Sequence, residues 1–276
     1  MPSSTTLLFG AKAVFLYFSI ASEMDSKNRT ADYEFTIVVP VYNEEGNIQR
    51  LSEAFGSYLP KCPRKACVLF VNDGSKDSSL DGIRRICSEN PDFLYISFTK
   101  NRGLTAAMKA GFDYTQSPLV GYIDADLQTT PEDYDLLLED IDSYSMVIGI
   151  RANRKDSFFK NLQSKIANGW RRMMTKDGAI DTGCPLKVLH TDVAKKLPLF
   201  KGLHRFLPAL VLLQEGGSYK QVPVRHFPRT AGQSKFHLWN RLWGPFMDCF
   251  AYRWMKKRYL NYNVGEDNVT YEEQSQ

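Results

Sequence analysis

Cysteine is scarce in this sequence: only five of its 276 residues are cysteines, and they show no paired metal-ligand spacing. An odd number of such cysteines favours a reducing compartment without structural disulfides. The four histidines also lack the short spacing of a zinc site. A GxGxxG fingerprint and a P-loop are both missing, which argues against ordinary dinucleotide-binding and NTPase domains, and no nucleic-acid-binding motif is visible.

Long hydrophobic runs are scarce as well. The apolar stretch at residues 7–21 is interrupted by Lys12 and is shorter than the roughly 20 apolar residues that span a bilayer. No basic segment precedes it, which weakens a signal-peptide interpretation. We therefore expect residues 1–33 to be an N-terminal extension and linker, ahead of a domain that begins near Glu34.

The composition suits an ordinary globular protein. Apolar residues make up 43% of the chain, which is enough for a full core, and the net charge of +4 is mild. The basic residues are unevenly spread, so their positions matter more than their total.

Short apolar segments alternate with helical segments through the first half of the chain. The first, residues 35–41, is rich in β-branched side chains and leads into a helix with acidic residues in its first turn. This alternation predicts an α/β fold, with a largely parallel sheet and helices on both faces. The expected strands are residues 35–41, 67–71, 93–98, 119–123 and 146–150.

Polar side chains follow the carboxyl ends of these strands, which is where an open α/β sheet places its ligand crevice. Turn chemistry alone also puts Asn, Asp and Gly after strands, so no single residue is decisive. Their agreement across five strands predicts a site. The side chains are Tyr42, Glu44, Asp73, Asn101, Arg102, Asp124, Asp126 and Arg151.

Two carboxylates follow the fourth expected strand directly. Side chains alternate along a strand, so Asp124 and Asp126 fall on the same side. Close like charges repel unless a cation lies between them, and Mg²⁺ often binds through one or two carboxylates plus substrate phosphates. The pattern therefore favours a metal and diphosphate site, although a plain surface turn would show the same motif.

Several motifs together resemble those of family 2 glycosyltransferases of the GT-A fold. In the first half the matching segments are Val39–Glu45, Val71–Ser75, Asn101–Gly103 and Asp124–Gln128, in family order. In the second half they are Asp181–Cys184, His204–Pro208 and Pro228–Phe236. These later segments look like the branch that includes dolichol-phosphate mannose synthase and bacterial polyprenyl-phosphate glycosyltransferases. The resemblance implies an inverting, metal-dependent transfer of a hexose from a nucleotide-diphosphate sugar to a polyprenyl phosphate.

The resemblance also implies roles for individual residues. The expected catalytic residues are Asp126, Arg151 and Asp181, and the expected ligands of Mg²⁺ or Mn²⁺ are Asp124, Asp126 and Gln128. Nucleotide-sugar contacts are expected from Pro40, Tyr42, Glu44, Asp73, Asp124 and Gln128, with Asp73 accepting hydrogen bonds from the base. Acceptor-phosphate contacts are expected from Arg151, Lys160, Ser164, His204, Arg205, Arg229, Ser234 and Lys235. Lys160 stands where the pattern more often has arginine, so the charge is kept but the bidentate fork is lost.

Two other functions remain open at this point. Family 2 enzymes that act on a hydroxyl of a cell-surface polysaccharide or other glycan need a general base, for which Asp181 is the candidate. A phosphate acceptor is already largely ionised at neutral pH and needs cations instead, and residues 151–172 supply several. A third possibility, a GT-A domain that binds nucleotide without catalysis, is disfavoured by the intact Asp73, Asp124 and Asp126.

The C-terminal part is aromatic and basic. Residues 236–262 place aromatic side chains three or four positions apart, which predicts an amphipathic helix with Gly244 and Pro245 breaking or kinking it. Such a stripe beside a basic cluster suits a membrane interface, and core packing or a homo-oligomer contact would suit it equally. Many relatives carry two transmembrane helices after the catalytic domain, and none occurs before Gln276. We expect a catalytic domain at residues 34–235, a polar tail at 263–276, and a cytoplasmic protein that contacts the inner membrane face peripherally through residues 236–258.

Overall fold

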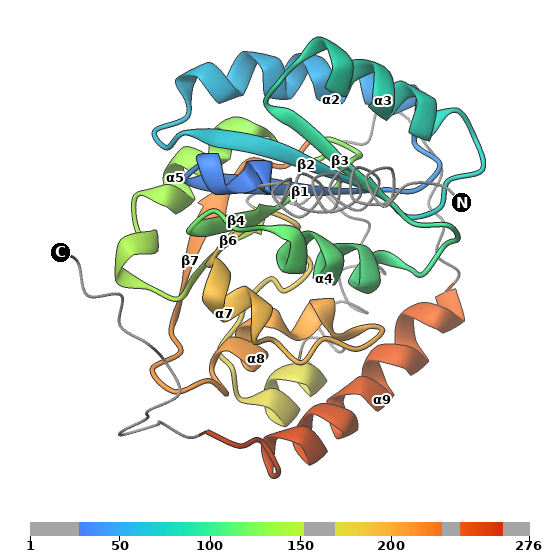
Figure 1. Ribbon diagram of the computed structural model, residues 1–276. Coiled ribbons are helices and arrows are strands. Elements are labelled where there is room, and N and C mark those ends of the chain that lie inside the picture. Colours follow the sequence, from blue (N-terminus) through green and yellow to red (C-terminus); the bar gives the residue numbers. More distant parts are fainter. Residues whose placement is uncertain (1–27, 152–168, 228–237, 262–276) are drawn as a thin grey trace, which may run out of the picture.

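The computed structural model describes residues 28–151, 169–227 and 238–261 of the chain (Figure 1). This part contains a seven-stranded sheet with the strand order β3-β2-β1-β4-β6-β5-β7. All neighbouring strands are parallel except β6, which is antiparallel to both β4 and β5. The strands are β1 Phe35–Val41, β2 Ala66–Asn72, β3 Phe93–Ser97, β4 Leu119–Tyr122, β5 Met146–Arg151, β6 Lys187–His190 and β7 Tyr219–Val224.

Helices cover both faces of the sheet, as the sequence predicts. Figure 1 shows α2 and α3 on one side and α4, α7, α8 and α9 on the other. The α-helices are α2 Glu45–Tyr58, α3 Ser79–Glu89, α4 Leu104–Tyr114, α5 Tyr134–Leu138, α7 Thr191–Lys195, α8 Leu207–Val211 and α9 Leu238–Lys256. The 3₁₀ helices are η1 Arg29–Asp32, η2 Leu59–Lys61, η3 Pro131–Asp133, η4 Ile141–Ser143 and η5 Leu203–Phe206. Residues 169–175 are also helical.

The five expected strands are all present, with ends within a residue or so of those predicted. The sequence analysis missed β6 and β7. The strand β6 has four residues and starts with the buried Lys187, and β7 contains Pro223, so neither shows the long β-branched run that marks β1. The sheet is therefore mixed on the side of β4 where both missed strands lie.

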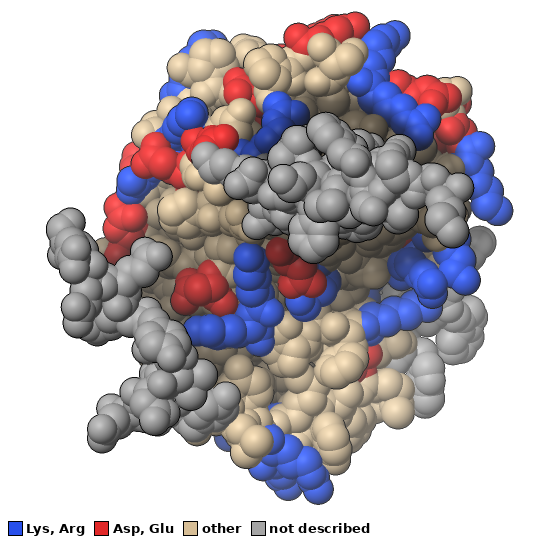
Figure 2. Space-filling model, in the orientation of Figure 1, with Lys and Arg blue, Asp and Glu red and all other residues tan. Residues whose placement is uncertain are grey.

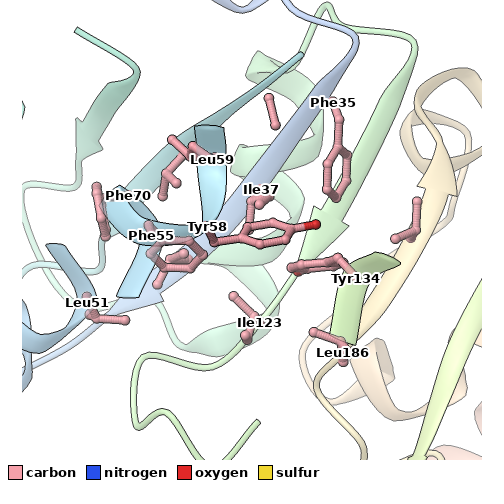
Figure 3. Close-up of a cluster of buried hydrophobic side chains, with 14 of the residues drawn as sticks. Phe35, Ile37, Leu51, Phe55, Tyr58, Leu59, Phe70, Ile123, Tyr134 and Leu186 are labelled. Atoms are coloured by element: carbon pink, nitrogen blue, oxygen red, sulfur yellow. The ribbon is translucent and has the colours of Figure 1, made fainter. Parts of the chain in front are cut away.

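Two buried apolar clusters lie on the two faces of the sheet. Figure 3 shows the cluster beneath α2, where Tyr58 and Tyr134 point toward each other with ring centroids 6.4 Å apart. The Tyr134 ring also meets Phe35 edge-on at 5.2 Å. The hydroxyl of Tyr58 donates to Asp135 at 2.9 Å, so this polar group is satisfied inside an apolar core.

A break or a kink is expected at Gly244 and Pro245, and the helix α9 continues through both residues, so the break does not occur. A proline within a helix costs one backbone hydrogen bond, and tertiary packing can offset that cost. Here Cys249 and Tyr252 are buried against the second cluster, and the Phe246 ring stacks on Trp170 with centroids 5.0 Å apart. Packing rather than helix propensity therefore decides this segment.

Among the residues that the structure describes, no helix is both long enough and apolar enough to cross a bilayer.

Candidate active site

The expected site residues within the described ranges gather at the carboxyl ends of the parallel strands. Pro40 and Tyr42 lie at the end of β1, Asp73 directly follows β2, and Arg151 ends β5. Asp124, Asp126 and Gln128 follow β4, Glu44 caps α2, Asp181 lies in the segment before β6, and His204 and Arg205 belong to η5. Lys160, Ser164, Arg229, Ser234 and Lys235 lie outside the described residues.

Asp73 is buried and organises the loop that leads into α4. Its Oδ1 accepts a hydrogen bond from the backbone N–H of Arg102 at 2.6 Å, and its Oδ2 accepts from the N–H of Gly103 at 2.8 Å. The Asn101 side chain donates to the same Oδ2 at 2.9 Å. Gly74 follows with φ +62°, and a Cβ there would lie 2.4 Å from backbone carbon of Lys100. Asp73 therefore holds the start of α4, and its contact with a base stays a prediction.

The two carboxylates after β4 each have one oxygen engaged by the chain itself. The Tyr122 hydroxyl donates to Oδ1 of Asp124, and the backbone N–H of Gln128 donates to Oδ1 of Asp126 at 3.2 Å. Leu127, between Asp126 and Gln128, has φ +52°, a left-handed conformation that is uncommon for a leucine and sharpens the turn. This turn keeps both carboxylates at the strand end.

The charges of this pair suit a divalent cation. Burial raises the pKa of Asp124, and the neighbouring charge of Asp126 raises it further, so the two carboxylates are unfavourable neighbours without a positive charge between them. Among the described residues, no three or more His, Cys, Asp or Glu side chains are placed so that they could hold one metal ion together. Mg²⁺ needs no such cage, because it commonly keeps several waters and binds one or two carboxylates together with substrate phosphates. The oxygen ligands present therefore fit Mg²⁺ or Mn²⁺.

Arg151 and Asp181 form a bidentate ion pair beside these carboxylates. The guanidinium Nε and Nη2 donate to the two Asp181 oxygens at 2.8 and 2.9 Å, and the Arg151 backbone N–H donates at 3.2 Å. Burial alone would raise the pKa of Asp181, but the hydrogen bonds and charge of Arg151 outweigh it and the pKa is lowered. A Cβ at Gly183 would lie 2.8 Å from Arg151 Nη2, so only glycine fits at that position without displacing the guanidinium.

Lys187 is part of the site, and the sequence analysis missed it. It is 3% exposed, and its ammonium donates to the carbonyl of Cys184 and lies 5.5 Å from the centroid of the Tyr122 ring. Lys187 opposes Tyr122 in the antiparallel β4–β6 pair. Because β6 was not expected, no signal in the sequence placed this lysine beside Asp124.

His204 is held at the start of α4. Its Nδ1 is 2.7 Å from the hydroxyl of Thr105, which also accepts the backbone N–H of Gly202 at 3.1 Å. Burial, with a smaller contribution from Arg205, lowers the pKa of His204 to about 3. The imidazole is therefore neutral at physiological pH and would meet a phosphate through an N–H group and not as a cation.

Hydrogen bonds join the loops after β1 and β2. The backbone N–H of Glu44 donates to the Ser79 hydroxyl at 2.8 Å, and that of Lys76 donates to the Asn43 side chain at 2.8 Å. Glu45 accepts from the Ser78 backbone N–H at 3.1 Å. These bonds set the wall of the site that carries Tyr42 and Glu44.

Residues 36–194 match the family described as glycosyl transferase family 2. The chain belongs to glycosyl transferase family 2. It is 31% identical over 208 residues to a dodecaprenyl-phosphate galacturonate synthase from Rhizobium johnstonii, which covers 74% of this chain and 62% of the relative. It is also 31% identical over 206 residues to an undecaprenyl-phosphate 4-deoxy-4-formamido-L-arabinose transferase from Edwardsiella ictaluri, covering 74% and 63%. The match thus spans less than two thirds of either relative.

Solved structures show that this family 2 chain has the GT-A fold. Glucosyl-3-phosphoglycerate synthase from Mycobacterium tuberculosis, in complex with Mn²⁺, UDP and glucosyl-3-phosphoglycerate, superposes with a TM-score of 0.62 at 13% identity, covering 82% of this chain and 81% of that one. A mannosyltransferase from Pyrobaculum calidifontis, in complex with GDP-mannose and Mn²⁺, gives a TM-score of 0.55 at 18% identity, covering 81% and 70%. The predicted family and fold are confirmed, and at such low identity these structures support the fold alone.

Proposed function

We propose that this family 2 glycosyltransferase moves a hexose from a nucleotide-diphosphate sugar to a polyprenyl phosphate, with inversion and with a divalent metal ion. The observation that carries the proposal is that carboxylates suited to a metal ion and a guanidinium suited to a phosphate lie at the same edge of the sheet. The carboxylates of Asp124 and Asp126 lie after β4, and the guanidinium of Arg151, fixed by Asp181, lies at the end of β5. The two relatives described above are named as polyprenyl-phosphate sugar transferases, which supports the same acceptor class.

On the donor side, Asp124, Asp126 and Gln128 would hold Mg²⁺ or Mn²⁺. When bound, the ion supplies positive charge to the departing diphosphate, whose negative charge grows as the glycosidic bond breaks. Tyr122 keeps one oxygen of Asp124 turned toward the protein, which leaves the carboxylate oriented. The loop held by Asp73 would form the floor for the nucleotide.

On the acceptor side, the state of Asp181 favours a phosphate over a hydroxyl. A hydroxyl acceptor requires a general base, and a carboxylate with a lowered pKa that is bound on both oxygens by Arg151 is a weak one. A lipid phosphate has a second pKa near about 6, so it is largely ionised and needs only cations. Arg151 uses one edge of its guanidinium on Asp181, and the other N–H groups of a guanidinium remain suited to phosphate oxygens.

A membrane surface is the expected location of such an acceptor, and α9 has the chemistry to contact one. Its side chains Met247, Phe250 and Trp254 are 48%, 46% and 60% exposed. Figure 2 shows basic side chains at the lower edge of the molecule, where Figure 1 places the C-terminal end of α9. The basic residues of this end are Arg253, Lys256, Lys257 and Arg258, all exposed. Apolar side chains beside lysines and arginines suit the interface of an anionic bilayer.

The reaction is tested with purified protein, Mn²⁺ or Mg²⁺, a panel of radiolabelled nucleotide sugars and undecaprenyl phosphate. The expected result is label in the organic phase that disappears with EDTA and in Asp126→Asn. Hydrolysis of the donor without lipid labelling would instead favour a hydroxyl acceptor. Absence of both hydrolysis and transfer, with tight nucleotide binding, would favour a non-catalytic binding domain.

The membrane contact is tested by sedimentation with vesicles that contain anionic lipid. The double variant Phe250→Ser, Trp254→Ser is expected to lose binding, because it removes the exposed rings and leaves the basic residues in place. Tyr95→Ser is the matched control, since Tyr95 is 42% exposed on β3 at the far edge of the sheet. Unchanged sedimentation of the folded double variant would refute this contact.

A further inference from the structure

Lys187 is a buried cation that neither the family motifs nor the proposed reaction assigns. Taking an ammonium group out of water is costly unless other charges or hydrogen bonds compensate. Its ammonium donates to the Cys184 carbonyl and lies over the face of the Tyr122 ring, and neither group carries a formal charge. Burial lowers the pKa of Lys187, and Cys184, Asp124 and Asp181 counteract this. Because burial raises the pKa of the Cys184 thiol to about 11, the negative charges at neutral pH are those of the two carboxylates. The charges that compensate this lysine are therefore those of the site itself.

The position of Lys187 is set by the sheet. Tyr122 and Lys187 are directly opposed in the β4–β6 pair, so their side chains share one face of the sheet. The Tyr122 hydroxyl in turn donates to Asp124. The lysine thus lies on the same face of the sheet as Tyr122, whose hydroxyl connects it to Asp124.

The charges of the cluster explain what such a lysine can do. The cluster consists of the carboxylates Asp124, Asp126 and Asp181 and the cations Arg151 and Lys187. Together these five side chains carry one net negative charge. A bound divalent ion would bring the cluster to one net positive charge, which attracts a diphosphate. Without the lysine, the same cluster would attract the metal more strongly but would be neutral once the metal is bound.

We propose that Lys187 is a fixed positive charge of the donor site, which weakens binding of the free metal ion and strengthens binding of the nucleoside diphosphate to the metal-loaded site. It acts as a positioning residue through the field it exerts on Asp124 and on the bound donor. The inference rests on the proposed function, because it requires a metal and diphosphate at Asp124 and Asp126.

The test measures two affinities that this role moves in opposite directions. Mn²⁺ binding is followed by the EPR signal of the free ion, and UDP or GDP binding, whichever the wild type prefers, by calorimetry at saturating Mn²⁺. Lys187→Gln and Lys187→Met remove the charge with two different shapes. Compared with the wild type, both variants are expected to bind Mn²⁺ roughly 3- to 10-fold more tightly and to bind the nucleotide more weakly by a similar factor. Lys187→Arg keeps the charge and is expected to bind both ligands as the wild type does.

Thermal melting separates this role from a structural one. Asp124 and Asp181 keep their charges when Lys187 is replaced, so the melting temperature of metal-free Lys187→Met is expected to fall, and Mn²⁺, which supplies positive charge at the same site, is expected to restore it. A loss of stability that Mn²⁺ does not restore would indicate a structural role instead. Lys65→Met is the matched control: it removes another lysine that lies 5.2 Å from a tyrosine ring, that of Tyr33, away from the site. It should change neither affinity.

The outcomes also distinguish this inference from the proposed function. Unchanged or weaker Mn²⁺ affinity in the folded Lys187 variants would overturn the inference alone, provided that the wild type binds Mn²⁺ and nucleotide. Loss of folded protein in both uncharged variants would overturn it too, because the charge would then be structural. A wild type that binds neither ligand would overturn the proposed function and this inference together.

Discussion

The substitution Gly183→Ala is expected to displace the Arg151 guanidinium while leaving the stability of the fold nearly unchanged. An added Cβ at residue 183 would lie 2.8 Å from Arg151 Nη2, whereas ordinary contacts begin at 3.4 Å. The guanidinium must therefore move by the difference, about 0.6 Å, away from its 2.9 Å hydrogen bond to Asp181. The displaced atom is the end of a flexible side chain, so the fold can absorb the change.

The expected effect is large on activity and small on stability. A displacement of about 1 Å in a positioned group can cost on the order of 100-fold in rate, so a shift of this size is expected to lower transfer roughly 10-fold or more. The free energy of unfolding should change by less than about 1 kcal/mol, because the clash lies at a side-chain end and an alanine restricts the unfolded chain more than glycine does.

The assay compares initial rates of label transfer to undecaprenyl phosphate with urea unfolding curves of the same preparations. Gly56→Ala is the control: it lies within α2, no other atom is within 4 Å of its added Cβ, and alanine there should stabilise the helix by about 0.5–1 kcal/mol without changing the rate. Wild-type turnover in a folded Gly183→Ala variant would refute the role assigned to the Arg151 guanidinium.

Two further predictions concern buried and half-buried charges. Asp177→Asn removes the charged partner of Arg171, and the side chains of Asp177 and Arg171 are 0% and 7% exposed. Because the substitution leaves a buried charge unpaired, it should lower the free energy of unfolding by about 3–5 kcal/mol. Urea unfolding measures this loss, and a loss below about 1 kcal/mol would contradict the prediction. For Asp181, whose folded pKa is lowered with Arg151 as the stabilising partner, the contribution to stability is present above the unfolded pKa of about 3.9 and is lost as the pH falls through the folded value. The stability gap between wild type and Asp181→Asn should therefore be constant from pH 5 to 7 and shrink below about pH 4, and a gap that does not change with pH would contradict the assignment.

Local patterns in the sequence predict the parallel half of the sheet well. The strands β1, β2 and β4 are buried, largely apolar runs, and each is followed by polar residues that the structure places at the site. The relative positions of Asp124 and Asp126 are different, because β4 ends at Tyr122 and the turn after it, not the alternation of side chains along a strand, places the two carboxylates. The spacing of apolar residues and the positions of strand ends depend on residues close together in the chain, so one sequence is enough to predict them.

Contacts between distant segments could not be predicted in the same way. The sequence leaves a general-base role open for Asp181, and only the structure shows that its carboxylate is bound by Arg151, thirty residues earlier in the chain. Trp170 and Phe246 stack although they are far apart in sequence, and this contact lies beside the Gly244–Pro245 pair through which α9 continues. No local pattern encodes either contact.

The sequence alone determined the α/β class, the glycosyltransferase family and the strand ends that carry the site, because all of these depend on side-chain period and on residues adjacent in the chain. The tertiary structure decided that β6 runs antiparallel beside β4 and so brings Lys187 opposite Tyr122, whose hydroxyl donates to Asp124. It also decided that Arg151 is fixed by Asp181, with glycine at 183 leaving room for the guanidinium. Such pairings depend on strand register and on which segments pack together, and these are settled only when the whole chain folds.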